Sequence, residues 1–296
     1  MEDISRKAAV LIEALPYIQR FRNAIVVVKF GGSAMEDPAH VESVLDDIAF
    51  MECVGMKVVV VHGGGKEISR GMKDAGIEST FVRGLRVTCA RSIEVVERVL
   101  KMDVNPRIVK LLTQKGAPAR GLNGEDIFRV QRMTETDPET GATLDWGFVG
   151  EPGEVLTAPI HAMLAEGLIP VLTPLGMGPG NQVHNINADV AAAAVAKALK
   201  ARKLAFLSDV PGLLRDPQDP ESLITTLRLD EVEWLVKQGV ISGGMLPKIR
   251  SCIEALEAGV RKVHMIDGRM FHSLLMEMFT DKGVGTEIVA GGIDEV

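Results

Sequence analysis

Two lysines, Lys29 and Lys248, lie in glycine-rich segments, and these segments are the best candidates in the sequence for an anion-binding or catalytic site. Lys29 follows a run of apolar residues at 25–28 that reads as a buried strand. Gly31 and Gly32 come next, where the backbone must turn sharply or approach a ligand closely. Ligands of open α/β sheets bind beyond the carboxyl ends of the strands, and a cation beside bare N–H groups there suits a phosphate. On this segment alone, an ordinary turn with a surface lysine is an equally good interpretation.

The same design recurs at residues 58–65, where four valines lead into His62 and three glycines. Three consecutive glycines are costly in conformational entropy, and a helical pattern follows at residues 67–75. Two such loops at strand ends favour an anion site over coincidence. His62 either orients the turn or touches a substrate, and the sequence leaves both roles open.

A polar segment brings Asn185, Asn187 and Asp189 into alternating positions ahead of an alanine-rich helix predicted at residues 190–200. The three side chains share one face if the segment is extended. Asp189 can alternatively begin the helix as its cap. A cap explains one polar residue, whereas three in register suggest a polar site.

Further cations lie in other loops and at a helix start. Lys248 opens a helix predicted at residues 248–258, where its charge opposes the helix macrodipole and a bound anion would offset this. Residues 81–88 form a short irregular stretch that carries Arg83 and Arg86. An arginine beside an anion site is a candidate carboxylate clamp because its planar fork matches a carboxylate. A solvated surface arginine is the alternative.

Several familiar kinds of site are absent from the sequence. There is no Gly-x4-Gly-Lys-Ser/Thr loop, no Gly-x-Gly-x-x-Gly, no protein-kinase catalytic motif and no nucleophile elbow. No His, Cys and carboxylate cluster has metal-ligand spacing. Phosphoryl transfer depends mostly on positioning and charge neutralisation, so glycine loops, two lysines and one aspartate are sufficient for it.

The elements that must position these residues alternate between apolar runs and helical patterns, which is typical of a parallel sheet covered by helices. Further helices are predicted at residues 39–51, 91–101, 106–114, 158–166 and 273–279, and further strands at residues 169–173, 203–208, 263–266 and 285–289. Residues 127–132 and 144–149 flank a turn signal at 136–141 and predict an antiparallel hairpin. The loop at 176–180 is a candidate lobe boundary.

Residues 4–22 predict a helix that precedes the first core strand. Its apolar stripe consists of Ile4, Ala8, Leu11, Ile12, Leu15 and Ile18. Pro16 should kink this helix near Ile12, whose carbonyl its ring obstructs. The stripe packs either on its own subunit or on another copy of the chain, and both remain open.

The composition excludes some partners. The 296 residues carry a net charge of −7, which gives no reason to expect nucleic acid or an anionic membrane. No apolar run approaches the ~18 residues of a membrane span, and the N-terminus has no signal-peptide pattern. The three cysteines, Cys53, Cys89 and Cys252, are far apart, so we expect reduced and mostly buried thiols of a cytoplasmic protein.

Six segments occur in the order found in the amino acid kinase family, and together they resemble most closely its acetylglutamate kinase branch over residues 24–289. They are Lys-Phe-Gly-Gly at 29–32, Val-His-Gly-Gly-Gly at 61–65, Leu-Arg-Val-Thr at 85–88, Asn-Ile-Asn-Ala-Asp at 185–189, Ser-Asp-Val-Pro-Gly at 208–212 and Gly-Gly-Met-Leu-Pro-Lys at 243–248. Each motif is modest evidence, but six in order leave little room for chance.

The resemblance implies one α/β unit, a three-layer αβα sandwich with a mainly parallel central sheet. An N-lobe at about 24–178 would bind the acyl amino acid and support dimerisation, a C-lobe at about 179–289 would bind ATP, and residues 1–23 would form an interlacing helix. ATP would phosphorylate the side-chain carboxylate of N-acetyl-L-glutamate for arginine synthesis. That carboxylate has a pKa near ~4.3, so it is already an anionic nucleophile and needs no general base.

The resemblance also assigns roles to residues. Lys29 and Lys248 would stabilise the transition state together with Mg²⁺, and Asp189 would hold both lysines in place. The substrate-binding positions would be Gly64, Gly65, Arg86, which would take the α-carboxylate, and Asn185. The ATP-binding positions would be Gly31, Gly32, Ser208, Asp209, Gly212, Leu213, Gly243, Gly244 and Met245. We expect Mg²⁺ to be held by phosphates and water, with no protein ligand.

An N-terminal helix with an aromatic such as Tyr17 resembles the arginine-inhibited form of this branch. There the helices interlace dimers into a ring-shaped hexamer, a trimer of dimers, and arginine binds between the helix and the C-lobe. Residues 272–285 resemble that effector region, with Tyr17, Glu277 and Gly283 as expected contacts. The sequence does not show whether a signalling protein also binds this chain.

Two alternatives remain open. One is a related kinase acting on N-acetyl-aminoadipate, aspartate, carbamate or a nucleotide monophosphate, since one methylene is worth only ~1–3 kcal/mol in a pocket. The other is a non-catalytic arginine sensor, although intact Lys29, Asp189 and Lys248 argue against it.

Overall fold

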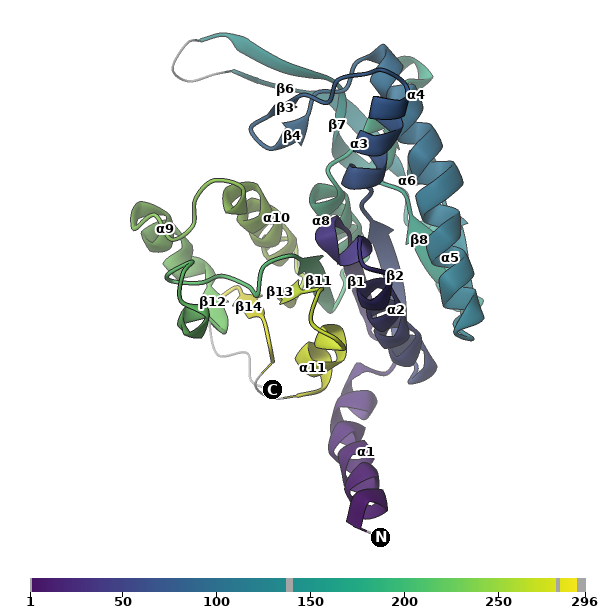
Figure 1. Ribbon diagram of the computed structural model, residues 1–296, viewed down its shortest axis with the longest axis vertical. Coiled ribbons are helices and arrows are strands. Elements are labelled where there is room, and N and C mark those ends of the chain that lie inside the picture. The colour runs from purple at the N-terminus through teal and green to yellow at the C-terminus, as the bar shows by residue number, and fades with distance from the viewer. Residues whose placement is uncertain (1, 137–140, 281–282, 292–296) are drawn as a thin grey trace.

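Eight strands form the central sheet of the computed structural model, which describes residues 2–136, 141–280 and 283–291 (Figure 1). Their spatial order is β12-β14-β13-β11-β1-β2-β8-β5. The strands are β1 (Ile25–Phe30), β2 (Lys57–His62), β5 (Ala119–Leu122), β8 (Ile169–Leu172), β11 (Lys203–Ser208), β12 (Thr226–Arg228), β13 (Lys262–Asp267) and β14 (Thr286–Val289). Neighbouring strands run parallel except β13 and β14, so the predicted mainly parallel sheet is confirmed.

Each face of the sheet has its own hydrophobic core, because successive side chains of a strand point to opposite faces. Val26 and Val28 pack with one set of helices, and Val27 packs with the other. The first set is α2 (Pro38–Cys53), α3 (Gly65–Asp74), α4 (Ala90–Val99), α5 (Asn105–Gln114) and α11 (Ser273–Phe279). The second is α7 (Ala158–Ala165), α8 (Ala188–Ala198), α9 (Leu229–Lys237) and α10 (Met245–Glu257). Helix, sheet and helix therefore form the three expected layers.

A smaller set of strands lies beside the main sheet. β6 (Phe128–Thr136) and β7 (Thr143–Val155) form the predicted antiparallel hairpin. They close a small barrel with β9 (Leu175–Met177) and β10 (Val183–Asn185). Part of the predicted turn, residues 137–140, lies outside the described residues. The remaining short helices are η1 (Gly32–Met35), α6 (Gly124–Ile127), η3 (Pro179–Asn181) and η4 (Pro220–Ser222).

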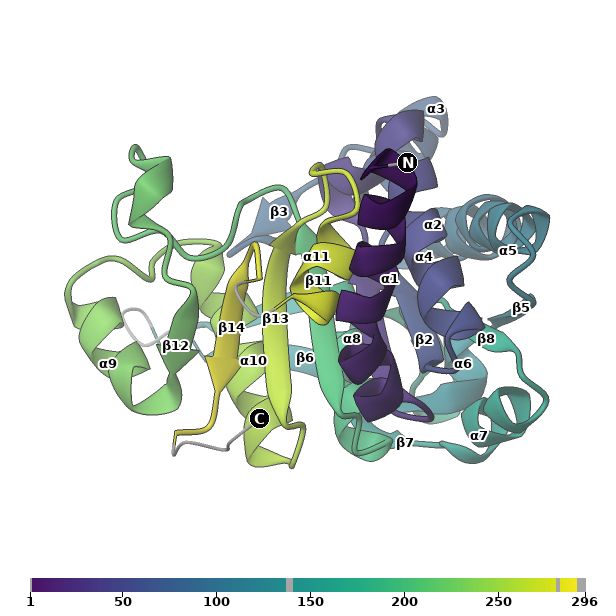
Figure 2. The same ribbon diagram turned by 90° about the horizontal axis from the view of Figure 1, so that it is seen from below.

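Helix α1 (Glu2–Phe21) runs through Pro16 and extends from the lower end of the molecule in Figure 1, and Figure 2 shows it beside α11. Its last part packs on the first core through Tyr17, Ile18 and Phe21. The middle of the stripe stays uncovered, since Leu11 is 65% and Ile12 is 69% exposed. This chain alone therefore does not bury the apolar stripe.

Three expectations about local structure were wrong. Residues 81–88 are not irregular, because β3 (Phe81–Val82) and β4 (Leu85–Arg86) pair as a short hairpin. The two helices predicted after residue 90 are present as α4 and α5, and a π-helical turn that was not anticipated, η2 (Leu100–Val104), joins them. The predicted loop at 176–180 overlaps strand β9, whose partner β10 follows it in the chain. Cys53 and Cys89 are exposed and only Cys252 is buried, so the thiols are not mostly buried.

Candidate active site

One carboxylate between two lysines lies at the carboxyl edge of the central sheet. Lys29 is near the end of β1, Asp189 is in the first turn of α8, and Lys248 is in α10. Lys29 Nζ lies 3.0 Å from Asp189 Oδ1, and Lys248 Nζ donates to Asp189 Oδ2 at 2.5 Å. Their side chains are only 11–17% exposed. The structure thus brings together three residues that are distant in the sequence.

The charges of this cluster are strongly coupled. Burial alone would raise the pKa of Asp189, but the charges of Lys29 and Lys248 outweigh it and lower the pKa to about 2. Asp189 is therefore ionised at neutral pH, and the cluster carries one net positive charge. A partly buried positive cluster at a sheet edge attracts an anion.

The two glycine loops lie against each other beside Lys29. A Cβ atom at Gly31 would lie 3.1 Å from the Cα and N atoms of Gly63, so a side chain there would force the loops apart. The N–H of Gly63 also donates to the carbonyl of Phe30 at 2.7 Å. Gly32 has a φ of 71°, a conformation that glycine adopts without strain. These glycines place bare backbone next to the lysine.

His62 orients its loop. It is fully buried, its Nδ1 donates to the carbonyl of Gly63 at 2.8 Å, and its Nε2 accepts from Asn105 at 3.1 Å. Burial lowers the pKa of His62 to about 4, so the ring is neutral. Asn105 also donates to the carbonyl of Val171 at 2.8 Å. The sequence analysis missed Asn105, which carries no local signal because its partners come from β2 and β8.

Arg86 lies against the start of α3. Its guanidinium donates to the carbonyl of Gly65, to Ser69 and to Ser79 at 2.7–2.8 Å, and it stacks on the ring of Phe81 at 4.6 Å. The residue is only 8% exposed, and burial lowers its pKa. The structure therefore joins Arg86 and Gly65 and is inconsistent with a solvated surface arginine. Ser69 and Ser79 were not anticipated.

The polar segment before α8 is a helix cap followed by an acidic first turn. Asn187, not Asp189, caps α8, because its side chain accepts from the N–H groups of Asp189 and Val190 at 2.8 and 3.3 Å. This leaves the Asp189 carboxylate free to meet the lysines. Asn185 is the last residue of β10 and is half-buried.

The predicted nucleotide-binding segments lie at the end of β11 and at the start of α10. In the sheet, β11 lies on the opposite side of β1 from β2. Ser208 ends β11, which pairs with β1, and exposed Asp209 follows it. Gly243 has a φ of 54°, Gly244 precedes α10, and Met245 is its first residue. Gly212 and Leu213 are buried, unlike Asp209.

Leu213 is almost fully buried in the second core, and its N–H donates to Thr286 Oγ1 at 2.8 Å. A Cβ atom at Gly212 would lie 2.5 Å from the same hydroxyl. The side chain of Leu213 therefore serves packing, and Gly212 allows the close approach to β14.

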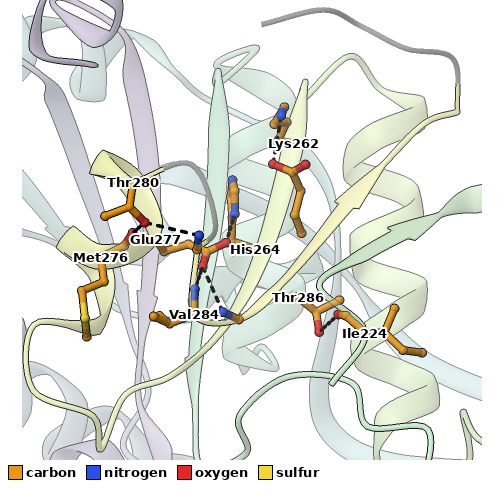
Figure 3. Close-up of polar contacts among 11 residues, drawn as sticks. Ile224, Lys262, His264, Met276, Glu277, Thr280, Val284 and Thr286 are labelled. Carbon is orange, nitrogen blue, oxygen red and sulfur yellow. Dashed lines mark hydrogen bonds and ion pairs between the residues drawn. The ribbon is translucent and has the colours of Figure 1, made fainter. Parts of the chain in front are cut away.

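The expected effector residues gather around α11. Glu277 accepts from His264 Nδ1 at 2.7 Å and from the N–H groups of Val284 and Gly285 at 2.7 and 3.0 Å (Figure 3). Burial alone would raise the pKa of Glu277, but these hydrogen bonds outweigh it and lower the pKa to about 2. A Cβ atom at Gly283 would lie 2.6 Å from Glu277 Oε2.

Tyr17 packs on the first core, to which α11 also contributes. Residues 281–282 of the predicted effector region lie outside the described part of the chain.

No three of the described histidine, cysteine, aspartate and glutamate side chains come together in a way that could hold a metal ion. The carboxylate of Asp189 is engaged by both lysines. None of the helices in the described ranges combines the length and apolar character that a bilayer crossing needs.

Known proteins are similar to this chain in sequence and in fold. The model of the amino acid kinase family matches residues 24–267. An acetylglutamate kinase of Heliobacterium modesticaldum is 48% identical over 96% of this chain and 98% of its own length, and that of Symbiobacterium thermophilum is 47% identical over 96% and 97%. The structure of N-acetylglutamate synthase from Neisseria gonorrhoeae, complexed with coenzyme A and N-acetyl-glutamate, superposes with a TM-score of 0.83 at 27% identity. The match covers 97% of this chain and 64% of that one. The chain belongs to the amino acid kinase family.

Proposed function

We propose that this chain transfers the γ-phosphoryl group of ATP to the side-chain carboxylate of N-acetyl-L-glutamate, the second step of arginine biosynthesis. The observation that carries the proposal is the Lys29–Asp189–Lys248 cluster, with ion-pair distances of 3.0 and 2.5 Å, at the edge where two glycine loops meet. The relatives of Heliobacterium and Symbiobacterium, named acetylglutamate kinases, support the choice of substrate.

The chemistry needs charge neutralisation and no general base. A carboxylate oxygen of the acyl amino acid attacks the γ-phosphorus while the bond to the β,γ-bridging oxygen breaks, and ADP leaves. Both reactants are anionic, so Lys29 and Lys248 stabilise the charge that develops in line between them. Mg²⁺ bound with ATP would supply further positive charge. We expect phosphates and water to hold it, because both lysines already engage Asp189.

Asp189 acts as a positioning residue for both lysines. It binds one lysine from β1 and one from α10, so a single carboxylate sets the position of two cations. The glycine loops lie beside Lys29. Apart from the N–H of Gly63, which donates to Phe30, the N–H groups of residues 31–32 and 64–65 suit phosphate oxygens.

The acyl amino acid binds on the side of β2 and α3. Arg86 takes its α-carboxylate, Gly64 and Gly65 approach it with bare backbone, and Asn185 meets a polar group. The hydrogen bonds of Arg86 to Ser69 and Ser79 support this role because they fix the guanidinium beside Gly65. The nucleotide binds on the side of β11 and the start of α10. The lobe boundary near residue 178 stays a prediction.

The test is ADP release with Mg-ATP and one acceptor at a time: N-acetyl-L-glutamate, glutamate, aspartate or N-acetyl-aminoadipate. Turnover confined to N-acetyl-L-glutamate supports the proposal. Turnover with another acceptor alone keeps the mechanism and overturns the substrate. No turnover with any acceptor, together with tight arginine binding, favours the non-catalytic sensor.

We also propose that arginine inhibits the enzyme and that α1 builds a hexamer, a trimer of dimers, in the cytoplasm. The uncovered stripe on α1 at Leu11, Ile12 and Leu15 supports assembly, since a second copy would remove it from water. Glu277 lies on α11, which α1 contacts, and its negative charge supports recognition of a cationic ligand. Inhibition requires that arginine bind the open and closed states with different affinities.

Deleting residues 1–22 should leave active dimers that arginine no longer inhibits. Sedimentation velocity measures the assembly, and ADP release with increasing arginine measures the inhibition. A truncated chain that arginine still inhibits would remove α1 from the regulatory proposal.

A further inference from the structure

A pocket of about 300 Å³ lies at the amino edge of the central sheet, away from the active site. Its lining comes from the segment between α1 and β1, the segment before β11, and the segment before β13. Lys29 lies toward the other end of β1, so roughly 13 Å of strand separates the two sites at ~3.3 Å per residue. The pocket therefore belongs to neither proposed substrate position.

The charged residues that line this pocket are all cations. They are Arg22, Lys200, Arg202 and Arg261, and no aspartate or glutamate lines it. None of the four forms an ion pair with a carboxylate of the described ranges. By contrast, Arg132, Arg228 and Arg269 each pair with an aspartate. The lining thus gathers four cations and no carboxylate, in a chain whose net charge is −7.

The backbone that carries the cations is held by hydrogen bonds. The N–H of Asn23, which has a φ of 62°, donates to the carbonyl of Gly55 at 2.7 Å. The N–H of Arg202 donates to the carbonyl of Ile25 at 2.9 Å. The first bond ties the segment after α1 to the segment before β2, and the second ties the residue before β11 to the start of β1.

The side chains are held in part as well. The Arg202 guanidinium lies 5.1 Å from the ring centre of Phe21. The stem of Arg22 lies over Gly55, where an added Cβ would be 3.3 Å from Arg22 Cγ. Burial lowers the pKa of Arg202, and the charges of Arg261 and Arg20 lower it further. The cations thus repel one another, and a bound anion would relieve that repulsion.

We propose that this pocket binds a polyphosphate group, either inorganic or the phosphate tail of a nucleotide. Arginine forks match phosphate oxygens in pairs, and three of the four cations are arginines. The volume is at the small end of ligand pockets, which suits a short chain of phosphates. A ligand there would connect Arg22, which follows α1, to Arg202 and Arg261 of the C-terminal half.

The experiment is isothermal titration of the full chain with inorganic triphosphate, without Mg²⁺, at 50 and 200 mM salt. The titrations are made in a Lys248→Ala background, so that binding at the active site is weakened. We expect one site whose affinity falls as salt rises, because three of its four cations are exposed. Lys200→Gln with Arg261→Gln should weaken binding at least tenfold.

The matched control is Arg91→Gln with Lys110→Gln, which removes the same charges from exposed positions on α4 and α5. Unchanged affinity in this control supports the pocket. Absence of binding, or equal affinity in the pocket variant and the control, overturns the proposal. A second titration with GTP distinguishes the sources: tighter binding than triphosphate indicates a nucleotide, and equal binding indicates the phosphate chain alone.

Discussion

The exchange Asp189→Asn tests the central charge cluster most directly. Asparagine has nearly the shape of a protonated aspartate, so the exchange removes the negative charge and little else. The lysines lower the pKa of Asp189 from 3.8 to about 2. At 1.36 kcal/mol per pKa unit, the ionised carboxylate contributes about 2 kcal/mol to the free energy of unfolding at neutral pH.

The pH dependence has a definite sign. Because the folded-state pKa is depressed, the stabilisation is fully present above the unfolded pKa of 3.8 and is lost as pH falls through about 2. Urea unfolding of the wild-type chain and Asp189→Asn at pH 7 should therefore differ by about 2 kcal/mol. The difference should shrink between about pH 4 and pH 2. Asp74→Asn, at an exposed position on α3, is the control and should follow the wild-type chain.

The same variant should lose activity for a separate reason. Without the negative charge of Asp189, no ion pair holds Lys29 and Lys248 at the 3.0 and 2.5 Å contacts, and the two cations repel each other. We expect kcat for ADP release to fall roughly 10²–10³-fold, the cost of losing one preorganised charge stabiliser. A variant as stable as the wild-type chain at pH 7, with kcat within a factor of about three, would refute the reasoning.

Three other substitutions give distinct outcomes. Lys248→Ala should lower kcat roughly 10²–10³-fold while circular dichroism shows an intact fold, since Asp189 keeps its contact with Lys29; near-normal turnover would remove Lys248 from the mechanism. Arg86→Ala should mainly raise KM for the acyl amino acid, and an unchanged KM would show that Arg86 does not bind this substrate. Gly64→Ala should lower the free energy of unfolding, measured with urea, by about 1–3 kcal/mol, because its Cβ would lie 2.7 Å from Leu100 Cδ2. An unchanged free energy of unfolding would show that the π-helical turn accommodates the methyl group without cost.

The sheet was predictable because its signal is local. Apolar runs such as residues 25–28 and 58–61 predict buried strands, and the helical patterns between them predict parallel pairing. The parallel pairing of β1 with β2 and β11 confirms this. The meeting of Lys29, Asp189 and Lys248 was expected from the family resemblance. Spacing along the chain alone does not imply it.

The features that were missed depend on distant partners. Asn105 matters because it reaches His62 and Val171, and no neighbour in the chain reveals this. Residues 175–177 became strand β9 because β10 returns beside them. Asn187, not Asp189, caps α8, because the Asp189 carboxylate pairs instead with lysines of β1 and α10.

The central place of β1 has a consequence for how the chain is made. β1 lies between β2, which follows it closely, and β11, which begins at Lys203. During synthesis, one edge of this largely apolar core strand must therefore wait for about 170 further residues to leave the ribosome. An unpaired apolar edge is a template for wrong pairing. The nascent N-terminal half thus needs protection from aggregation until residues 203–208 emerge, and the strand that carries Lys29 gains its second neighbour only after β2 and β8 have both of theirs.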